Sequence, residues 1–218
     1  MANRKFAIGF TLMLIVTMAG VKWHQNEQQN RIAEHESEQS VYVEAAIANT
    51  NQAFGLPMKK AGSIQDYAKF GKVARFANLF HSAVDYFAKP GTEVFAVADG
   101  EVYFSGAESG YGALVVITHD RPGIYSLYGH VSAKRWLVAK GVQVKKGQLI
   151  GYIADTNEGY GIGAVPHLHF SIRLGNPEDY PNSGRDNWMT GYTQKHPTFY
   201  NFVDPEQFIQ QTKMANRE

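Results

Sequence analysis

The chain has 218 residues, a formal net charge of +1 and no cysteine. That length allows one substantial core with appendages, and the small net charge gives no global attraction to nucleic acid. Basic clusters interleaved with aromatic residues are also missing from the sequence, so we expect no nucleic-acid partner. Without cysteine there is no thiolate metal site, no disulfide framework and no cysteine-linked lipid anchor.

Residues 1–23 have the pattern of an export signal, because Arg4 and Lys5 precede an apolar run from Phe6 to Val21. Such a segment is either a cleaved signal peptide or a signal anchor. The run is slightly short for a span of about 20 residues, but Trp23 can extend it into the interface. Thr17-Met18-Ala19 is a poor cleavage site, so we favour an uncleaved anchor with its positive end in the cytoplasm.

Residues 24–56 are rich in Gln, Asn and Glu, with few apolar side chains before Val41. A segment with so little apolar surface to bury does not form a core of its own. This composition therefore predicts a polar stalk, partly helical toward its end, where apolar residues cluster from Val43 to Ile47.

From Pro57 the composition becomes that of a folded β domain, which we place at residues 57–174. The spacings between apolar runs are short and rich in glycine, which indicates a mainly β fold with an antiparallel sheet rather than βαβ units. Ala133–Ala139 is expected to be a short helix or a turn. The expected strands are Glu93–Ala98, Glu101–Ser105, Ala113–Thr118, Ile124–Tyr128, Gln148–Ala154 and His167–Leu174.

Residues 175–218 are expected to form an irregular aromatic extension and a C-terminal helix packed on the domain. The helix should start at Pro205, with Asp204 as its N-cap. An aromatic loop can bind substrate, but packing over a sheet edge is the commoner role. The aromatic residues are Tyr180, Trp188, Tyr192, Phe199 and Tyr200.

Three polar motifs point to chemistry: His81-x-x-x-Asp85, Tyr128-Gly129-His130 and His167-Leu168-His169. Side chains two residues apart share one face of a strand, so His167 and His169 point the same way, away from the apolar residues between and after them. His81 and Asp85 share a face if Phe80–Phe87 is extended, and would also do so on a helix. Three of these side chains can hold one metal ion with two imidazoles beside it, which is the composition of a zinc hydrolase site.

The alternative for any single histidine is a surface or core position, since the chain has eight of them. His24, His35 and His196 lie in polar or irregular stretches and are expected to be exposed. His119 ends a predicted strand and is expected to be structural or to line the rim of the site.

With these motifs the chain resembles the lysostaphin-like and LytM-like zinc metallopeptidases of family M23, which cut peptidoglycan peptides. The resemblance covers nearly half of the chain, and both order and internal spacing match. The matching segments are His81–Tyr86, Pro90–Val102, Gly110–His119, Tyr128–His130, Gly141–Gly151 and Pro166–Phe170.

The resemblance implies that His81, Asp85 and His169 are the ligands of Zn²⁺, and that His130 and His167 assist catalysis. It further implies an antiparallel β-sheet metallopeptidase domain of the LytM-like, duplicated-hybrid-motif type, here with an N-terminal membrane helix and stalk. The implied function is hydrolysis of peptide cross-links between peptidoglycan stem peptides for cell-wall remodelling. The expected location is the cell envelope, outside the cytoplasm or in the periplasm, with the N-terminal segment in the bacterial inner membrane.

Three departures from the family pattern concern loop shape and substrate fit and do not remove a ligand. The family usually has glycine at the positions of Ala83 and Val165. The loop Gly159–Ala164 lacks the usual Ser or Thr.

The sequence contains no HExxH motif, so no glutamate at that spacing can act as the base. His130 or His167 is left to take and return protons, since imidazole titrates near neutral pH. Which of the two is the base stays open, as do the bond that is cut, the protein partners and the oligomeric state.

Parts of the sequence also resemble proteins with three other functions. Gly141–Gly151 also resembles the hairpin of lipoyl and biotinyl carrier domains, but Lys145 and Lys146 precede Gly147 in an ordinary turn. A related fold occurs in cytoplasmic sugar phosphotransferase carriers, which an export signal disfavours. The stronger alternative is a catalytically silent or latent M23-like domain that binds the wall or activates amidases, but such domains lose ligands, and here all five positions are filled.

Overall fold

A computed structural model describes residues 2–60, 65–74, 78–119, 123–158, 164–184 and 187–216, with side chains from Thr17 onward. The chain divides into two units, Met1–Ser40 and Val41–Glu218. The helices are α1 (Ala2–Asn49), η1 (Asp66–Ala68), η2 (Pro177–Asp179), η3 (Pro197–Tyr200) and α2 (Pro205–Ala215). The strands are β1 (Val73–Ala74), β2 (Leu79–His81), β3 (Val84–Phe87), β4 (Glu93–Phe95), β5 (Gly100–Glu108), β6 (Gly112–Thr118), β7 (Ile124–Val131), β8 (Gln143–Val144), β9 (Leu149–Tyr152), β10 (His167–Leu174), β11 (Tyr192–Thr193) and β12 (Phe202–Val203).

Helix α1 contains the predicted membrane segment and most of the predicted stalk, so the stalk is helical over more of its length than expected. The side chains of Ala2–Val16, which make up most of the predicted anchor, lie outside the described ones. Where side chains are described, no helix has a stretch long and apolar enough to cross a membrane.

The packed unit begins at Val41, before the predicted boundary at Pro57. Ala46 is buried in its core, and Phe54 has no exposed surface. The ring of Phe54 packs edge-on against that of Phe208, with centroids 5.2 Å apart. The end of α1 and the segment that follows it are therefore part of the folded unit.

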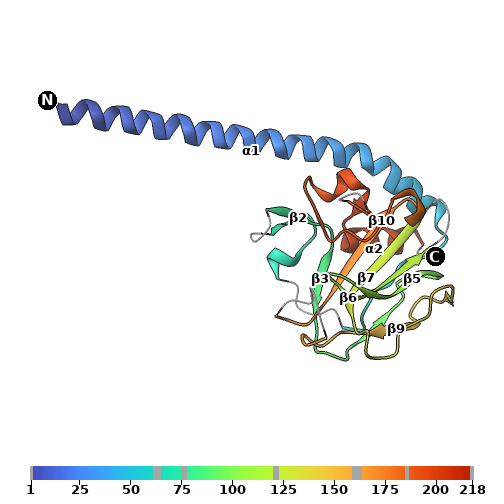
Figure 1. Cartoon of the computed structure of the whole chain (residues 1–218). Coiled ribbons are helices and arrows are strands. Elements are labelled where there is room, and N and C mark those ends of the chain that lie inside the picture. The colour runs from blue at the N-terminus through green and yellow to red at the C-terminus, as the bar shows by residue number, and fades with distance from the viewer. Residues whose placement is uncertain are drawn as a thin grey trace. The chain divides into compact units, whose positions relative to one another are not determined.

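The main sheet is antiparallel, with the strand order β12-β10-β7-β6-β5-β8, and β3 pairs with β10 beside β12. Figure 1 shows β5, β6, β7 and β10 within this unit. Two smaller sheets have the orders β1-β2-β11 and β4-β9. The prediction of a mainly antiparallel β fold is confirmed.

Both faces of the main sheet are covered, which explains the continuous apolar run in β6. Val115 and Ile117 face one apolar cluster together with Phe208 of α2. Leu114 and Val116 face a second cluster, which Trp188 of the C-terminal extension covers. The extension therefore packs over the sheet, as expected for most of its aromatic residues.

Some predicted element boundaries are confirmed and others are wrong. Strand β10 has the predicted bounds, and α2 starts at Pro205 with the Asp204 carboxylate accepting from two backbone N–H groups. The predicted extended segment Phe80–Phe87 is instead two strands, β2 and β3, that are separated at Ser82 and Ala83. Ala133–Ala139 contains bends and no helix.

Candidate metal site

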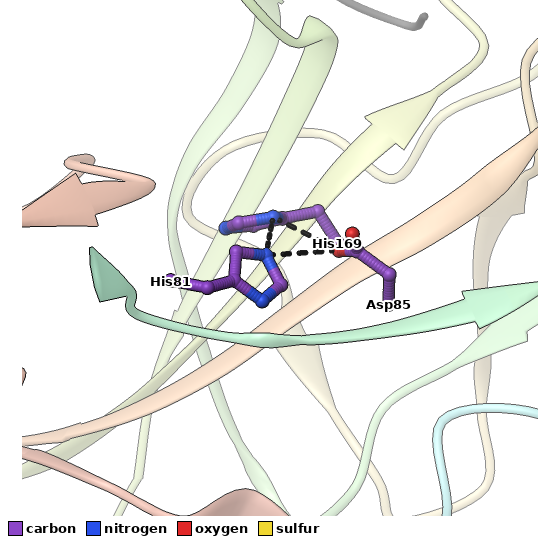
Figure 2. Close-up of side chains that lie close together, drawn as sticks. All are labelled: His81, Asp85 and His169. Atoms are coloured by element: carbon purple, nitrogen blue, oxygen red, sulfur yellow. Dashed lines mark hydrogen bonds and ion pairs between the residues drawn. The ribbon is translucent and has the colours of Figure 1, made fainter. Parts of the chain in front are cut away.

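The three predicted ligands come from three strands and converge on one point. β3 pairs with β10 so that Asp85 lies directly opposite His169, and β2 brings His81 to the same place. The distances are 3.1 Å from His169 Nδ1 to Asp85 Oδ1, 3.2 Å from His81 Nε2 to the same oxygen and 3.2 Å between the two nitrogens. Figure 2 shows the three side chains directed toward one another.

This triangle of donor atoms fits a metal ion. Tetrahedral zinc bonds of about 2.0–2.1 Å place neighbouring ligand atoms about 3.3 Å apart, close to the spacing seen here. All three residues are buried, at 2% exposure for His81, 8% for Asp85 and 3% for His169. One carboxylate and two imidazoles, each offering a single atom, form a group able to hold a metal ion.

The charge states of these groups also suit a metal. Burial alone would raise the pKa of the Asp85 carboxyl, but hydrogen bonds from His169 and His81 hold it well below its usual range. Burial lowers the pKa of His169. The carboxyl is therefore ionised and the imidazole neutral at pH 7, and metal ligands bind in these forms.

His167, predicted to assist catalysis, lies beside this group. Its Nε2 is 3.8 Å from Asp85 Oδ2, the carboxylate oxygen on the other side from the triangle. Its Nδ1 lies 2.8 Å from the carbonyl oxygen of Val165. A carbonyl can only accept, so the Nδ1 carries the proton and Nε2 is left as an acceptor.

His130 reaches the site through a β-bulge. In the β6–β7 ladder Leu114 pairs with Gly129 and Ala113 with Val131, so His130 is an extra residue without a partner. Its φ of 61° places it in the left-handed region, where residues other than glycine are uncommon. Regular alternation would have put its side chain on the face of Tyr128, opposite to His169. The bulge turns it toward His167 instead, with ring centroids 4.5 Å apart.

The His130 imidazole is buried, with Nδ1 3.2 Å from the carbonyl oxygen of Tyr111. Burial, with the nearby His167 and His169, lowers the pKa of His130 to about 3. The ring is therefore neutral, with the proton on Nδ1 and an acceptor at Nε2. The structure thus brings together all five predicted site residues.

All of them except His81 line a cleft of about 550 Å³, which is also lined by residues that the sequence did not assign to the site. Tyr111 and Tyr192 lie next to the predicted ligands, with ring centroids 5.5 Å from His169 and 5.3 Å from His81, respectively. Burial and the charge of Asp85 raise the pKa of Tyr192 to about 12, so its hydroxyl keeps the proton. The full lining is Tyr67, Asp85, Phe87, Gly110, Tyr111, His130, Ala164, Val165, His167, His169, Gly191 and Tyr192.

Sequence signals for the missed residues were present but weak. Tyr111 stands between two glycines in a segment that carries the family resemblance, and Tyr192 belongs to the aromatic extension. Nothing local to either residue shows that it meets the ligands, because the contacts join segments far apart in the chain.

The remaining predictions near the site have mixed outcomes. Ala83 is fully buried, whereas Val165 is 51% exposed at the cleft. Of the predicted loop, Gly159–Gly163 lie outside the described residues. His119 is structural as expected, since its ring nitrogens contact Asp99 O and Ser126 Oγ.

Among the histidines expected to be exposed, His24 is exposed, and His35 is half-buried. The expectation of exposure was therefore wrong for His35, and it was also wrong for His196. Its ring is half-buried and packs edge-on against Phe70 and Phe80, because the extension folds back onto the domain.

Comparison with known proteins gives matches in this same region. The chain is 41% identical over 94 residues to the DD-carboxypeptidase/endopeptidase Mpg of Neisseria meningitidis serogroup B, covering 43% of this chain and 20% of that protein. It is 42% identical over 86 residues to the murein hydrolase activator EnvC of Escherichia coli strain K12, covering 39% of this chain and 19% of that protein. The chain thus spans about a fifth of the length of these relatives.

A solved structure supports the fold. The crystal structure of cbpa from L. salivarius REN superposes with a TM-score of 0.52 at 21% identity, covering 77% of this chain and all of that one. Residues 79–181 match the model of Peptidase family M23. This stretch contains His81, Asp85, His130, His167 and His169, the five residues that the structure brings together. The match to Peptidase family M23 therefore covers the whole of the candidate site.

Proposed function

We propose that this protein is a zinc-dependent endopeptidase that hydrolyses peptide cross-links of bacterial peptidoglycan. The observation that carries this proposal is the convergence of His81, Asp85 and His169 into a metal-sized triangle. The imidazoles of His130 and His167 stand beside it and line the same open cleft. The names of relatives that act on peptidoglycan, among them a DD-carboxypeptidase/endopeptidase, support the choice of substrate.

The five site residues have two different roles in the proposed reaction. His81 Nε2, Asp85 Oδ1 and His169 Nδ1 would hold zinc, which in such a site polarises a peptide carbonyl and activates water at neutral pH. His130 and His167 each have Nδ1–H directed at a backbone carbonyl, so each presents Nε2 as a proton acceptor. Together they can take the proton of the attacking water and return it to the leaving amine. Burial favours neutral His130, so a proton gained there is readily released.

We further propose that the enzyme acts in the cell envelope, outside the cytoplasm, and is held at the inner membrane by its N-terminal segment. Arg4, Lys5 and the apolar run from Phe6 to Val21 support this location. Membrane fractionation of the full chain with and without residues 1–23 would test it. Recovery of both forms in the soluble fraction would contradict the anchor.

The function is tested by incubating the full chain with purified peptidoglycan, with and without a zinc chelator, and identifying the fragments by mass. We expect chelator-sensitive conversion of cross-linked dimers to monomers, restored by added zinc. His169→Ala should lose zinc and hydrolysis together, whereas His130→Ala should keep zinc and lose turnover. His24→Ala, which changes an exposed histidine of the first unit, is the matched control. Hydrolysis by His169→Ala at the wild-type rate would refute the proposal.

A second candidate function is that of a catalytically silent or latent regulator. It is favoured by the identity of 42% to a murein hydrolase activator. Against it stands the complete set of ligand and imidazole residues. A chain that binds one zinc per molecule and cuts no cross-link, yet raises the activity of a wall amidase, would establish this second function.

A further inference from the structure

The segment Asn187–Thr193 lies beyond residue 181, where the match to the family model ends, yet it reaches the metal site. Its strand β11 pairs with β2, and Tyr192 lies directly opposite His81 in that register. Next along the chain, Ser82 N donates to Gly191 O at 3.1 Å. The C-terminal extension thus adds a strand to the small sheet that carries the first predicted ligand.

The same segment is held from its other side. The hydroxyl of Tyr111 donates to Met189 O at 2.6 Å. Arg173, which is fully buried, donates from Nη1 to Asn187 O at 2.7 Å. The Arg173 guanidinium also lies 3.5 Å from the centroid of the Tyr180 ring. Since Arg173 is on β10, the strand of His169, the segment is fixed to the element that carries a predicted ligand.

Two residues of the segment lie directly against the ligand rings. The Tyr192 ring is tilted 38° to that of His81 at 5.3 Å, and its centroid is 6.4 Å from that of His169. At Gly191 an added Cβ would be 3.3 Å from the Nε2 and Cε1 atoms of His169, so the backbone there packs on that imidazole. Both residues also line the cleft.

We propose that Asn187–Thr193 is a wall of the metal cleft that the C-terminal extension supplies, and that Tyr192 in it is a positioning residue. Its ring holds the His81 imidazole in the orientation that points Nε2 at the metal position. On its other side the ring borders the space for the substrate peptide, a role that rests on the proposed function. Groups that orient metal-ligating histidines from outside the coordination shell commonly contribute 10–100-fold to metal affinity.

The positioning role is tested by metal binding alone, through competition with a zinc indicator and through the absorption spectrum of the Co²⁺-loaded full chain. We expect Tyr192→Ala to bind zinc about 10-fold or more weakly and to change the Co²⁺ spectrum. Tyr192→Phe keeps the ring and should match the wild type. Tyr42→Ala, at a tyrosine that is 71% exposed, is the control. Wild-type affinity and spectrum in Tyr192→Ala would overturn the role.

Loss of fold is separated from loss of positioning with Tyr192→Leu, which keeps apolar bulk in the wall but no aromatic ring. Weakened zinc binding in this variant, with the Tm of its zinc-free form equal to that of the wild type, supports positioning. Wild-type affinity in it shows that bulk suffices and overturns the role of the ring.

The substrate role is read from the kinetics of peptidoglycan cleavage at saturating zinc. We expect Tyr192→Ala to raise KM with little change in kcat, because the wall contacts substrate and transition state alike. An unchanged KM would remove this part of the proposal. If the wild type cuts no peptidoglycan, the proposed function fails, while the metal-binding experiment still decides the positioning role.

Discussion

Replacing Gly129 by alanine should damage both the fold and the metal site. Gly129 lies in β7 opposite His169, and the Tyr111 ring packs over it. An added Cβ would be 2.3 Å from Tyr111 Cδ1 and 2.6 Å from its Cε1. Ordinary carbon contacts are about 3.5–4.0 Å, so the ring must move by roughly 1 Å or more.

The expected loss of stability follows from these contacts. Overpacking of a buried site costs about 1–3 kcal/mol, and the bond from the Tyr111 hydroxyl to Met189 O adds about 1 kcal/mol when it breaks. Alanine also stabilises the protein by about 0.4–1 kcal/mol, because it lowers the conformational entropy of the unfolded chain. A net loss of about 2–3 kcal/mol corresponds to a fall in Tm of about 4–12 °C for a chain of this size.

Thermal unfolding followed by circular dichroism measures this loss, and zinc titration of the same samples measures the effect on the site. The matched control is Gly106→Ala in β5, where the added Cβ would meet only the Phe104 ring, at 4.0 Å. We expect the control to melt near the wild type. If Gly129→Ala has the Tm of the wild type and binds zinc with the wild-type affinity, Tyr111 does not pack over Gly129 in the way described.

Four further outcomes are expected. His130→Gly should be about 1–2 kcal/mol more stable than His130→Ala in urea unfolding, because φ at this position is 61°; the reverse order would argue against the bulge. The zinc-free protein should lose stability as the pH falls from about 6.5 toward 3. The reason is that the pKa of His130 is about 3 in the folded state, so between these pH values the imidazole binds a proton in the unfolded state and not in the folded one. His130→Gly should therefore reduce the dependence of Tm on pH, measured by thermal unfolding at a series of pH values. Zinc at 100 times its Kd should stabilise the protein by about 2.7 kcal/mol, and the same addition should leave the Tm of His169→Ala unchanged. Asp204→Ala should cost about 1 kcal/mol in chemical unfolding through loss of the α2 cap, and no change would mean that its two hydrogen bonds contribute nothing.

Much of the fold and of the site could be read from local patterns. The alternation in His167–Leu174 predicted both the bounds of β10 and the shared face of His167 and His169. Asp204 and Pro205 predicted the start of α2. These succeed because strand alternation and helix capping depend on neighbouring residues alone. Residue types and their spacing indicated a metal site, and the resemblance to family M23 implied which three side chains are its ligands.

Tertiary structure decided what depends on contacts between distant segments. The ladder with β6 leaves His130 in a bulge, and only that irregularity turns its imidazole to the side of His169. The extension brings Tyr192 onto His81, more than a hundred positions earlier in the chain. Phe54 belongs to the core because it packs on Phe208, although the sequence around it reads as a stalk. In each case the deciding interaction is between side chains or strands that no sequence window contains.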